Sequence, residues 1–334
     1  MAGRALAFSN PELIRLAKTQ FVPVACDDWY QRRREDAEGR FFRGVADQGP
    51  RDGRDGSTRQ GIYCLTADGH LLVYRNAGQS ASATLDELRE ALHNWEQLPA
   101  DRRAPGAVQV PDPGPLDGGY TRKPPEGTVI LNVFTRALDE ESAGAVAPAA
   151  ACKIGGGKES ARDHLWITRD EARQLVPDAP RIGQTFPVPD AIAGRMARFH
   201  LVDNTRGEPP FWTARDVRHC EMTLTVVAVS DDAVTMKFTG SVLLSTDADP
   251  ARASRGYDAS LLGDVVFDRH QRTFSKFDVA ALGRHWGEGR YTPDARPGRQ
   301  PLGVVFQLRD GRSPAADVPP QAARELDEYL GRAR

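Results

Sequence analysis

The sequence predicts an α+β fold of two domains. At 334 residues the chain exceeds the length at which one hydrophobic core usually stops growing. Helical and strand patterns alternate in the first hundred residues, whereas the second half contains mostly long β-hairpin patterns. A stretch dense in Pro and Gly lies between them. We therefore expect a domain at 1–100, a linker at 101–127, and an antiparallel β-rich domain at 128–334, half-barrel or sandwich-like, with a C-terminal helix.

The first domain contains three helical patterns and two β patterns. Asn10 and Pro11 form a helix start, so we expect a helix over 11–19. The run FVPVA at 21–25 predicts a short buried strand, in which Pro23 favours an irregular or edge position. Apolar residues at helical spacing predict a long helix over 27–47, interrupted near Gly39. A hairpin at 61–76 and a helix at 84–95 complete the domain.

The second domain is dominated by β patterns. TVILNVFTRAL at 128–138 predicts one strand, and a capping box from Thr168 to Glu171 opens a short helix. Two long hairpins turn at 230–233 and at 269–272, and a further strand is expected at 301–308. The low-complexity run at 143–161 is expected to be a mobile loop, and residues 319–334 a closing helix.

Charge and hydropathy exclude several classes of protein. The net charge is −2, and no basic-aromatic array is present, so we expect no nucleic-acid partner. The N-terminus has no long apolar segment, so we expect no signal peptide and no membrane span. The expected location is therefore the reducing cytoplasm.

The four cysteines are far apart, at positions 26, 64, 152 and 220. No CxxC occurs, so neither a zinc knuckle nor a dithiol redox motif is expected. Hydrolase, metalloprotease, dinucleotide and EF-hand motifs are also missing, and IGGGKES at 154–160 lacks the spacing of a phosphate loop. We expect no cofactor and no dedicated metal site.

The first hundred residues resemble a thioredoxin-like domain. The resemblance is carried by the strand FVPVA, the helix from Asp28-Trp29, the hairpin IYCLTADGHLLVYRNAG and the helix TLDELREALHNW. It implies a redox site where the strand meets the helix. If Asp28-Trp29 match the family segment before the first cysteine, the dithiol positions fall on Tyr30 and Arg33. If Cys26 is instead the nucleophile, its partner position is Trp29.

The chain departs from the family in the residues that matter for redox chemistry. Neither alignment leaves a second cysteine in place. The family's cis-proline position is taken by Thr58-Arg59-Gln60-Gly61, which contains no proline. The usual two-cysteine disulfide exchange is therefore not expected.

Candidate catalytic residues follow from this position: Cys26, Asp28, Tyr30 and Arg59. Cys26 is either a reactive thiol or a small buried hydrophobic residue. Asp28 caps the helix or acts as an acid or base. Arg59 stabilises a thiolate, binds a carboxylate, or is solvated in its loop.

Candidate binding residues lie in two places. Trp29, Arg33 and Gln60 surround the Cys26 position. The polar cluster RFHLVDNTRGEPPFW at 198–212, expected in a loop after a strand, adds His200, Asn204, Arg206 and Trp212. Ordinary turn chemistry accounts for this second cluster equally well. The neighbouring pairs His219-Cys220 and His285-Trp286 are expected to face opposite sides of strands and to be structural.

Three functions are compatible with these residues. The first is a single-cysteine oxidoreductase or thiol-reactive protein with a small-molecule or thiol substrate. The second is a non-catalytic protein that binds a ligand or a protein partner through a degenerate thioredoxin-like domain and a cleft in the β domain. The third is a soft-metal site formed by Cys26 and a histidine. The sequence leaves the oligomeric state open.

Overall fold

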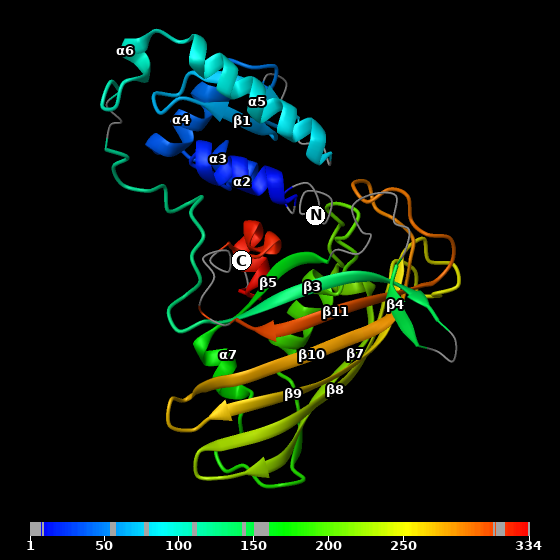
Figure 1. Cartoon of the computed structure of the whole chain (residues 1–334). Coiled ribbons are helices and arrows are strands. Elements are labelled where there is room, and N and C mark those ends of the chain that lie inside the picture. Colours follow the sequence, from blue (N-terminus) through cyan, green and yellow to red (C-terminus); the bar gives the residue numbers. More distant parts are fainter. Residues whose placement is uncertain are drawn as a thin grey trace. The chain divides into compact units, whose positions relative to one another are not determined.

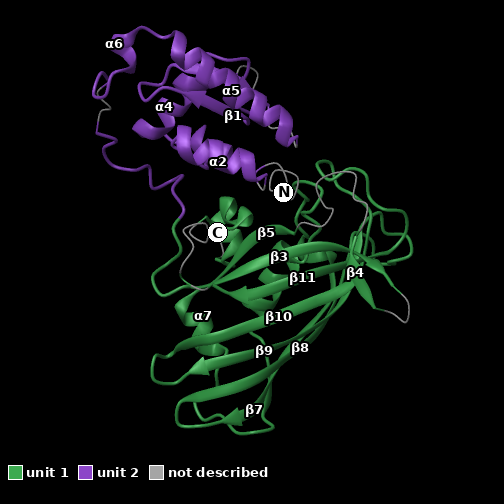
Figure 2. Cartoon of the chain, in the orientation of Figure 1, with its two compact units in different colours: residues 1–3, 123–334 green, residues 4–122 purple. Residues whose placement is uncertain are grey.

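The computed structural model divides the chain into two compact units (Figures 1 and 2). Unit 2 comprises residues 4–122, and unit 1 comprises residues 1–3 and 123–334. The division falls inside the stretch expected to be a linker. The structure describes residues 8, 10–53, 58–76, 80–108, 112–141, 145–149, 160–309, 311 and 318–332.

Unit 2 is mainly helical and contains one β-hairpin. Its elements are α2 (Pro11–Gln20), α3 (Asp28–Gln31), α4 (Ala37–Ala46), β1 (Ile62–Leu65), β2 (Leu71–Arg75), α5 (Ala81–Gln97) and α6 (Ala100–Arg103). The predicted first helix is confirmed, and the Asn10 side chain accepts from Leu13 N at 3.0 Å as its N-cap. The predicted hairpin is also confirmed. The predicted helix at 84–95 is longer, because Ser80 caps it.

Two predictions for this unit are wrong. Residues 21–25 form no strand: β1 pairs only with β2, and no other ladder is present in the described part of unit 2. The expected long helix over 27–47 is two helices, α3 and α4. The break lies before Gly39, because the Asp36 carboxylate caps α4 by accepting from Gly39 N and is bound by Arg34.

The core of unit 2 is small. Leu13 of α2, Cys64 of β1 and Leu85, Leu88 and Ala91 of α5 are buried together. Phe21, at the end of α2, packs against the same cluster. Helix α5 therefore covers one face of the hairpin, and α2 packs against α5.

Unit 1 is built on one nine-stranded antiparallel sheet. The strands are β3 (Val129–Glu140), β4 (Val146–Pro148), β5 (Ala161–Ile167), β6 (Thr185–Pro187), β7 (Val217–Val229), β8 (Ala233–Ser245), β9 (Gly256–Asp268), β10 (Thr273–Trp286) and β11 (Gln300–Leu308). Their order is β4-β3-β11-β10-β9-β8-β7-β6, and β5 pairs with β3. The prediction of long antiparallel hairpins is confirmed. No helix in the described residues has the length and apolar character needed to cross a membrane.

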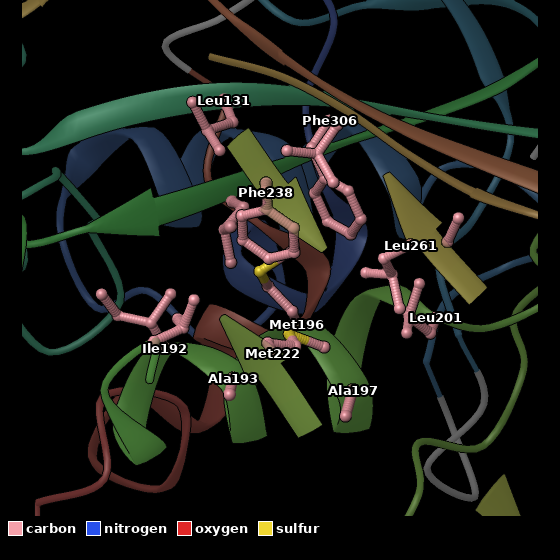
Figure 3. Packing of buried hydrophobic residues seen from close by; sticks show 14 of the residues in the cluster. Leu131, Ile192, Ala193, Met196, Ala197, Leu201, Met222, Phe238, Leu261 and Phe306 are labelled. Carbon is pink, nitrogen blue, oxygen red and sulfur yellow. The ribbon is translucent and has the colours of Figure 1, made fainter. Parts of the chain in front are cut away.

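Helix α8 (Asp190–Arg195) and the π-helix that continues it (Met196–His200) fill the inward face of the sheet. Met196 packs among Met222, Phe238, Leu261 and Phe306, which come from four strands (Figure 3). The strands alternate buried and exposed residues accordingly. The face that sequence reasoning offered as a binding cleft is thus occupied by the protein's own core.

Other elements differ from the predictions in detail. The capping box at Thr168 and Glu171 is confirmed and opens α7 (Arg169–Gln174). Strand β5 and helix α8 were not predicted. The C-terminal helix is shorter than expected: a 3₁₀ turn (Gln321–Glu325) leads into α9 (Leu326–Tyr329). The expected mobile loop at 143–161 lies largely outside the described residues.

A buried arginine fastens the C-terminal segment to the sheet. Arg195 of α8 donates to the carbonyls of Tyr329 at 2.7 Å and of Trp166 at 2.8 Å. Its remaining donors reach Glu171 at 2.8 and 2.6 Å. Burial favours the neutral acid, yet the hydrogen bonds from Arg195 hold the pKa of Glu171 below its usual range. Three segments distant in sequence, around residues 166–171, 195 and 329, therefore meet at one guanidinium.

Replacing this arginine should destabilise unit 1 strongly. Arg195→Met leaves the Glu171 carboxylate without its partner, so we expect a loss of roughly 3 kcal/mol. The exposed Arg173, which pairs with Asp170, is the matched control, and Arg173→Ala should cost less than about 1 kcal/mol. Hydrogen exchange of β3 and β5 in denaturant measures both. Equal effects of the two variants would contradict the role given to Arg195.

Candidate functional site

The first candidate site is the Cys26 segment, defined as residues 21–28. Cys26 is exposed and precedes α3. The helix is capped by Asp27, whose carboxylate accepts from Trp29 N at 2.8 Å, so the expectation that Asp28 is the cap is wrong. Asp28 instead accepts from Arg59 N at 3.2 Å and lies 3.8 Å from Arg32 Nε.

The surroundings of Cys26 disfavour a thiolate. Partial exclusion of water from the sulfur raises the pKa of Cys26, and Glu38, Asp27 and Asp28 raise it further. Helix α3 is only four residues long, so its dipole offers little compensation. The cysteine is therefore accessible but protonated at neutral pH.

Arg59 does not offset these acids. Its guanidinium binds Asp47 at 2.8 Å and the Asp52 carbonyl at 2.7 Å. Only its backbone N–H reaches Asp28. The Gln60 carbonyl accepts from the Tyr74 hydroxyl at 2.9 Å. Arg59 and Gln60 therefore hold the start of β1 in place.

The other residues expected near Cys26 form an aromatic cluster. Arg33 stacks over Trp29 with its Cζ 4.4 Å from the ring centre, and Trp29 contacts Tyr30 and Tyr120. Arg122 lies over Tyr30 at 5.8 Å. This cluster binds the residues around 120 to α3, which gives Trp29, Tyr30 and Arg33 a structural role.

Among the described residues, the remaining thiols form no redox pair. Cys64 is buried in the core, as expected, and burial with Glu87 raises its pKa to about 12. Cys26, Cys64 and Cys220 are free, and Cys152 lies outside the described residues. Within the described ranges no group of three His, Cys, Asp or Glu side chains is arranged to hold a metal ion.

The cluster at 198–212 begins inside the π-helix, so the expectation that it lies in a loop after a strand is wrong. His200 is buried: its Nε2 lies 3.0 Å from the Tyr329 hydroxyl and its Nδ1 3.3 Å from Asp163. Trp212 is also buried and donates from Nε1 to the Leu201 carbonyl at 2.9 Å. Asn204 is buried in the same loop. These three residues have little surface to offer a ligand.

Arg206 lies in the second candidate site, the Arg206 cavity. Its Nε donates to Asp203 at 2.8 Å, and its other donors reach the carbonyls of Gly287, Thr292 and Pro293. The cavity has a volume of about 20 Å³. It is lined by Ala137, Asp203, Thr205, Arg206, His285, Trp286, Gly287, Ala295, Arg296, Gln300 and Leu302.

Sequence reasoning missed His285 and Arg296. They come from the end of β10 and from the connection to β11, far from residue 206 in sequence, and neither belongs to a motif. The adjacent pair His285-Trp286 had been interpreted as structural. The signal in the sequence for this site was the polar cluster at 198–212, which predicted Arg206 as a binding residue.

Removing an acid near Cys26 should lower its pKa. Glu38→Gln deletes the largest neighbouring charge effect, so we expect a clear downward shift of the alkylation midpoint. The exposed Glu96→Gln is the control and should leave it unchanged. The measurement is the alkylation rate of Cys26 against pH, read by peptide mass spectrometry. A native midpoint below about 8.5 would contradict the protonated state.

Glu87 makes unit 2 sensitive to pH. Burial raises its pKa to about 7, against the opposing charge of Arg75 and with a further increase from Glu90. The folded pKa of Glu87 lies above the unfolded one, so its neutral carboxyl group favours the folded state. This contribution to stability is fully present below about pH 4.3 and is lost as pH rises through about 7.

We therefore expect Glu87→Gln to remove part of the stability change between pH 5 and pH 8. Exposed Glu90→Gln serves as its control, with a smaller effect. Hydrogen exchange of α5 at both pH values gives the measurement. An unchanged pH dependence in the Glu87→Gln variant would refute the assignment.

Comparisons of the chain with protein-family models, with curated proteins and with solved structures found no match in any of the three. The thioredoxin-like resemblance of the first hundred residues therefore stays a prediction. Of the elements that carried it, the helix–hairpin–helix part is present and the strand at 21–25 is not. The two sites are the features of this chain from which a function can be argued.

Proposed function

We propose that the chain is a partner-binding protein that pairs an extended strand of another polypeptide with its Cys26 segment. The proposal rests on the unpaired backbone and the exposed side chains of residues 22–26. Among the described residues, none of their backbone groups takes part in a hydrogen bond. Val22 is 90% exposed and Val24 is 82% exposed. A sequence with strand character is thus left without a strand partner.

One edge of the segment is suited to pairing. In extended chain, alternate residues direct their N–H and C=O groups to the same edge. Pro23 has no N–H, and Phe21 N is used by the Ala17 carbonyl at 3.2 Å. The opposite edge carries Val22, Val24 and Cys26, whose N–H and C=O groups are all open. Strand addition of this kind supplies affinity through main-chain hydrogen bonds.

Both ends of the segment are held in place. Phe21 has extended backbone angles and packs its ring on the core of unit 2. Asp27 is also extended and is fixed by its capping bond to Trp29 N. Anchored ends reduce the conformational entropy lost when a partner strand adds.

Charge indicates the chemistry of the partner. Asp27, Asp28 and Glu38 together place a negative field at Cys26. A partner strand that pairs with the edge formed by Val22, Val24 and Cys26 lies in this negative field where it passes Cys26. We therefore expect a peptide with alternating apolar residues and basic residues where it passes Cys26.

The thiol hypothesis receives less support. Its nucleophile is held in the protonated form by neighbouring acids, and no second thiol lies beside it in the described residues. The cysteine contributes its backbone to the proposed edge, which requires no chemistry at sulfur.

A synthetic peptide of alternating valine and threonine that ends in a pair of lysines tests the proposal. Binding should protect the amides of Val22, Val24 and Cys26 from hydrogen exchange and leave that of Ala25 exposed. Val24→Pro removes a donor from the edge and should weaken binding roughly tenfold, equivalent to about 1.4 kcal/mol. Fluorescence anisotropy of the labelled peptide measures the affinity.

The matched control is Ala25→Pro, whose lost N–H lies on the other edge, so binding should persist. A peptide that ends in glutamates should bind more weakly than the lysine form. Equal loss in both proline variants, or no binding of the lysine peptide, would refute the proposal. A dimer that depends on Val24 in the absence of peptide would assign the edge to a second copy and would also count against it.

A further inference from the structure

The Arg206 cavity lies in unit 1 and is independent of the Cys26 segment. It sits where β10 ends and the connection from residue 287 to residue 299 returns to β11. Its volume of about 20 Å³ admits one water molecule or a particle of similar size. The hydrogen-bonding groups of the cavity wall decide whether water or an ion of that size binds there.

The wall has more hydrogen-bond donors than its protein partners use. Of the five N–H groups of Arg206, four reach Asp203, Gly287, Thr292 and Pro293, and one remains.

Arg296 is similar. Its Nη1 group donates to Leu138 O at 2.7 Å and Asp139 Oδ1 at 2.9 Å, and its Nη2 to Pro301 O at 2.9 Å. One Nη2–H and the Nε–H remain. The Gln300 amide donates one of its two N–H groups to Pro297 O.

His285 adds a buried imidazole to this wall. The residue is 8% exposed, and its ring makes no hydrogen bond with any described residue. Burial lowers its pKa to about 4; the charge of Asp203 opposes this effect, and those of Arg206, Arg255 and Arg296 add to it. The ring is therefore neutral and keeps one N–H donor at physiological pH.

Fewer acceptors than donors are open in the lining: the second ring nitrogen of the neutral His285 and the amide oxygen of Gln300. Asp203 Oδ1 already accepts from the backbone N–H and hydroxyl of Thr205, and Oδ2 accepts from Arg206. A guest with lone pairs and no need to donate satisfies this wall better than water does.

The two arginines that line the cavity have carboxylate partners, whereas the neighbouring Arg255, which lies outside the lining, is attracted by Asp216 only at longer range. Arg206 is paired with Asp203, and Arg296 with Asp139. Arg255 is 6% exposed, and no carboxylate in the described residues lies within ion-pair distance of it. Its guanidinium stacks on Trp212 at 3.9 Å and donates to Pro210 O. A buried charge without a counter-charge is costly, and a nearby anion removes that cost.

We propose that the Arg206 cavity binds a small monovalent anion of the size of chloride or formate, held by the unused N–H groups of Arg206, Arg296 and His285. Through these residues the anion joins the connection 287–299 to the end of the sheet. The small volume favours an anion of this size over larger carboxylates and phosphates.

Thermal unfolding of the full chain tests this. Formate is compared with gluconate, which is too large for the cavity, at equal ionic strength. At about ten times its dissociation constant, formate should raise the midpoint of unit 1 by roughly 3–6 °C. Hydrogen exchange of β9 and β10 assigns the transition to unit 1. Equal midpoints in formate and gluconate would overturn the proposal.

A variant that carries its own anion sharpens the test. Gln300→Glu places a carboxylate in the wall, so its midpoint in gluconate should rise and the formate effect should disappear. Gln271→Glu introduces the same charge in an exposed turn and should keep the full formate effect. A full formate effect in the Gln300→Glu protein would contradict the site.

Crystals grown in bromide provide a readout that needs no variant. An anomalous peak within hydrogen-bond distance of Arg296 and His285 is expected. A fully ordered cavity with water and no bromide signal would overturn the proposal.

Discussion

The inward face of the nine-stranded sheet must be covered, and the rest of unit 1 depends on how this is done. The strands present buried side chains such as Phe238, Leu261 and Phe306 on one face, and α8 with its π-helical continuation fills that face. Close packing of this face requires that neighbouring strands can bend toward each other without a side chain between them. At Gly263 a Cβ would lie 2.2 Å from the Asp278 carbonyl, so no larger residue fits. Burial of this face outweighs any single polar contact in the unit.

The covering helix also carries the polar groups that hold the edges of the unit. Arg195, the last residue of α8, binds Glu171, and His200, the last residue of the π-helix, contacts Asp163 and Tyr329. The loop that follows brings Asp203 and Arg206 to the far end of the sheet. The position of α8 therefore sets both the C-terminal attachment and the wall of the Arg206 cavity.

The long hairpins could be predicted because their pattern is local. Alternation in Phe277 and Val279 matches the buried face, and the irregular spacing back to Phe274 corresponds to a bulge opposite β9. The run at 21–25 has the same kind of pattern but no strand beside it. Strand propensity describes a side chain on a half-buried surface, and the pattern alone does not supply that surface.

The sites were harder to predict because they depend on contacts between distant residues. The position of Cys26 follows from the sequence, whereas its electrostatics depends on Glu38, which α4 brings near. The cavity needs His285 and Arg296 beside Arg206, a meeting set by strand order. Helix α8 itself is six residues long and contains Gly194, too short a pattern to predict.

The pairing of β3 with β11 has a consequence for how this unit folds during its synthesis. The ribosome makes β3 long before its neighbour β11, and Tyr329 follows later still. The sheet cannot close around α8 until β11 has been made. In the interval between the two strands, the apolar faces of β7 to β10 lack part of their final covering and are open to non-native contacts.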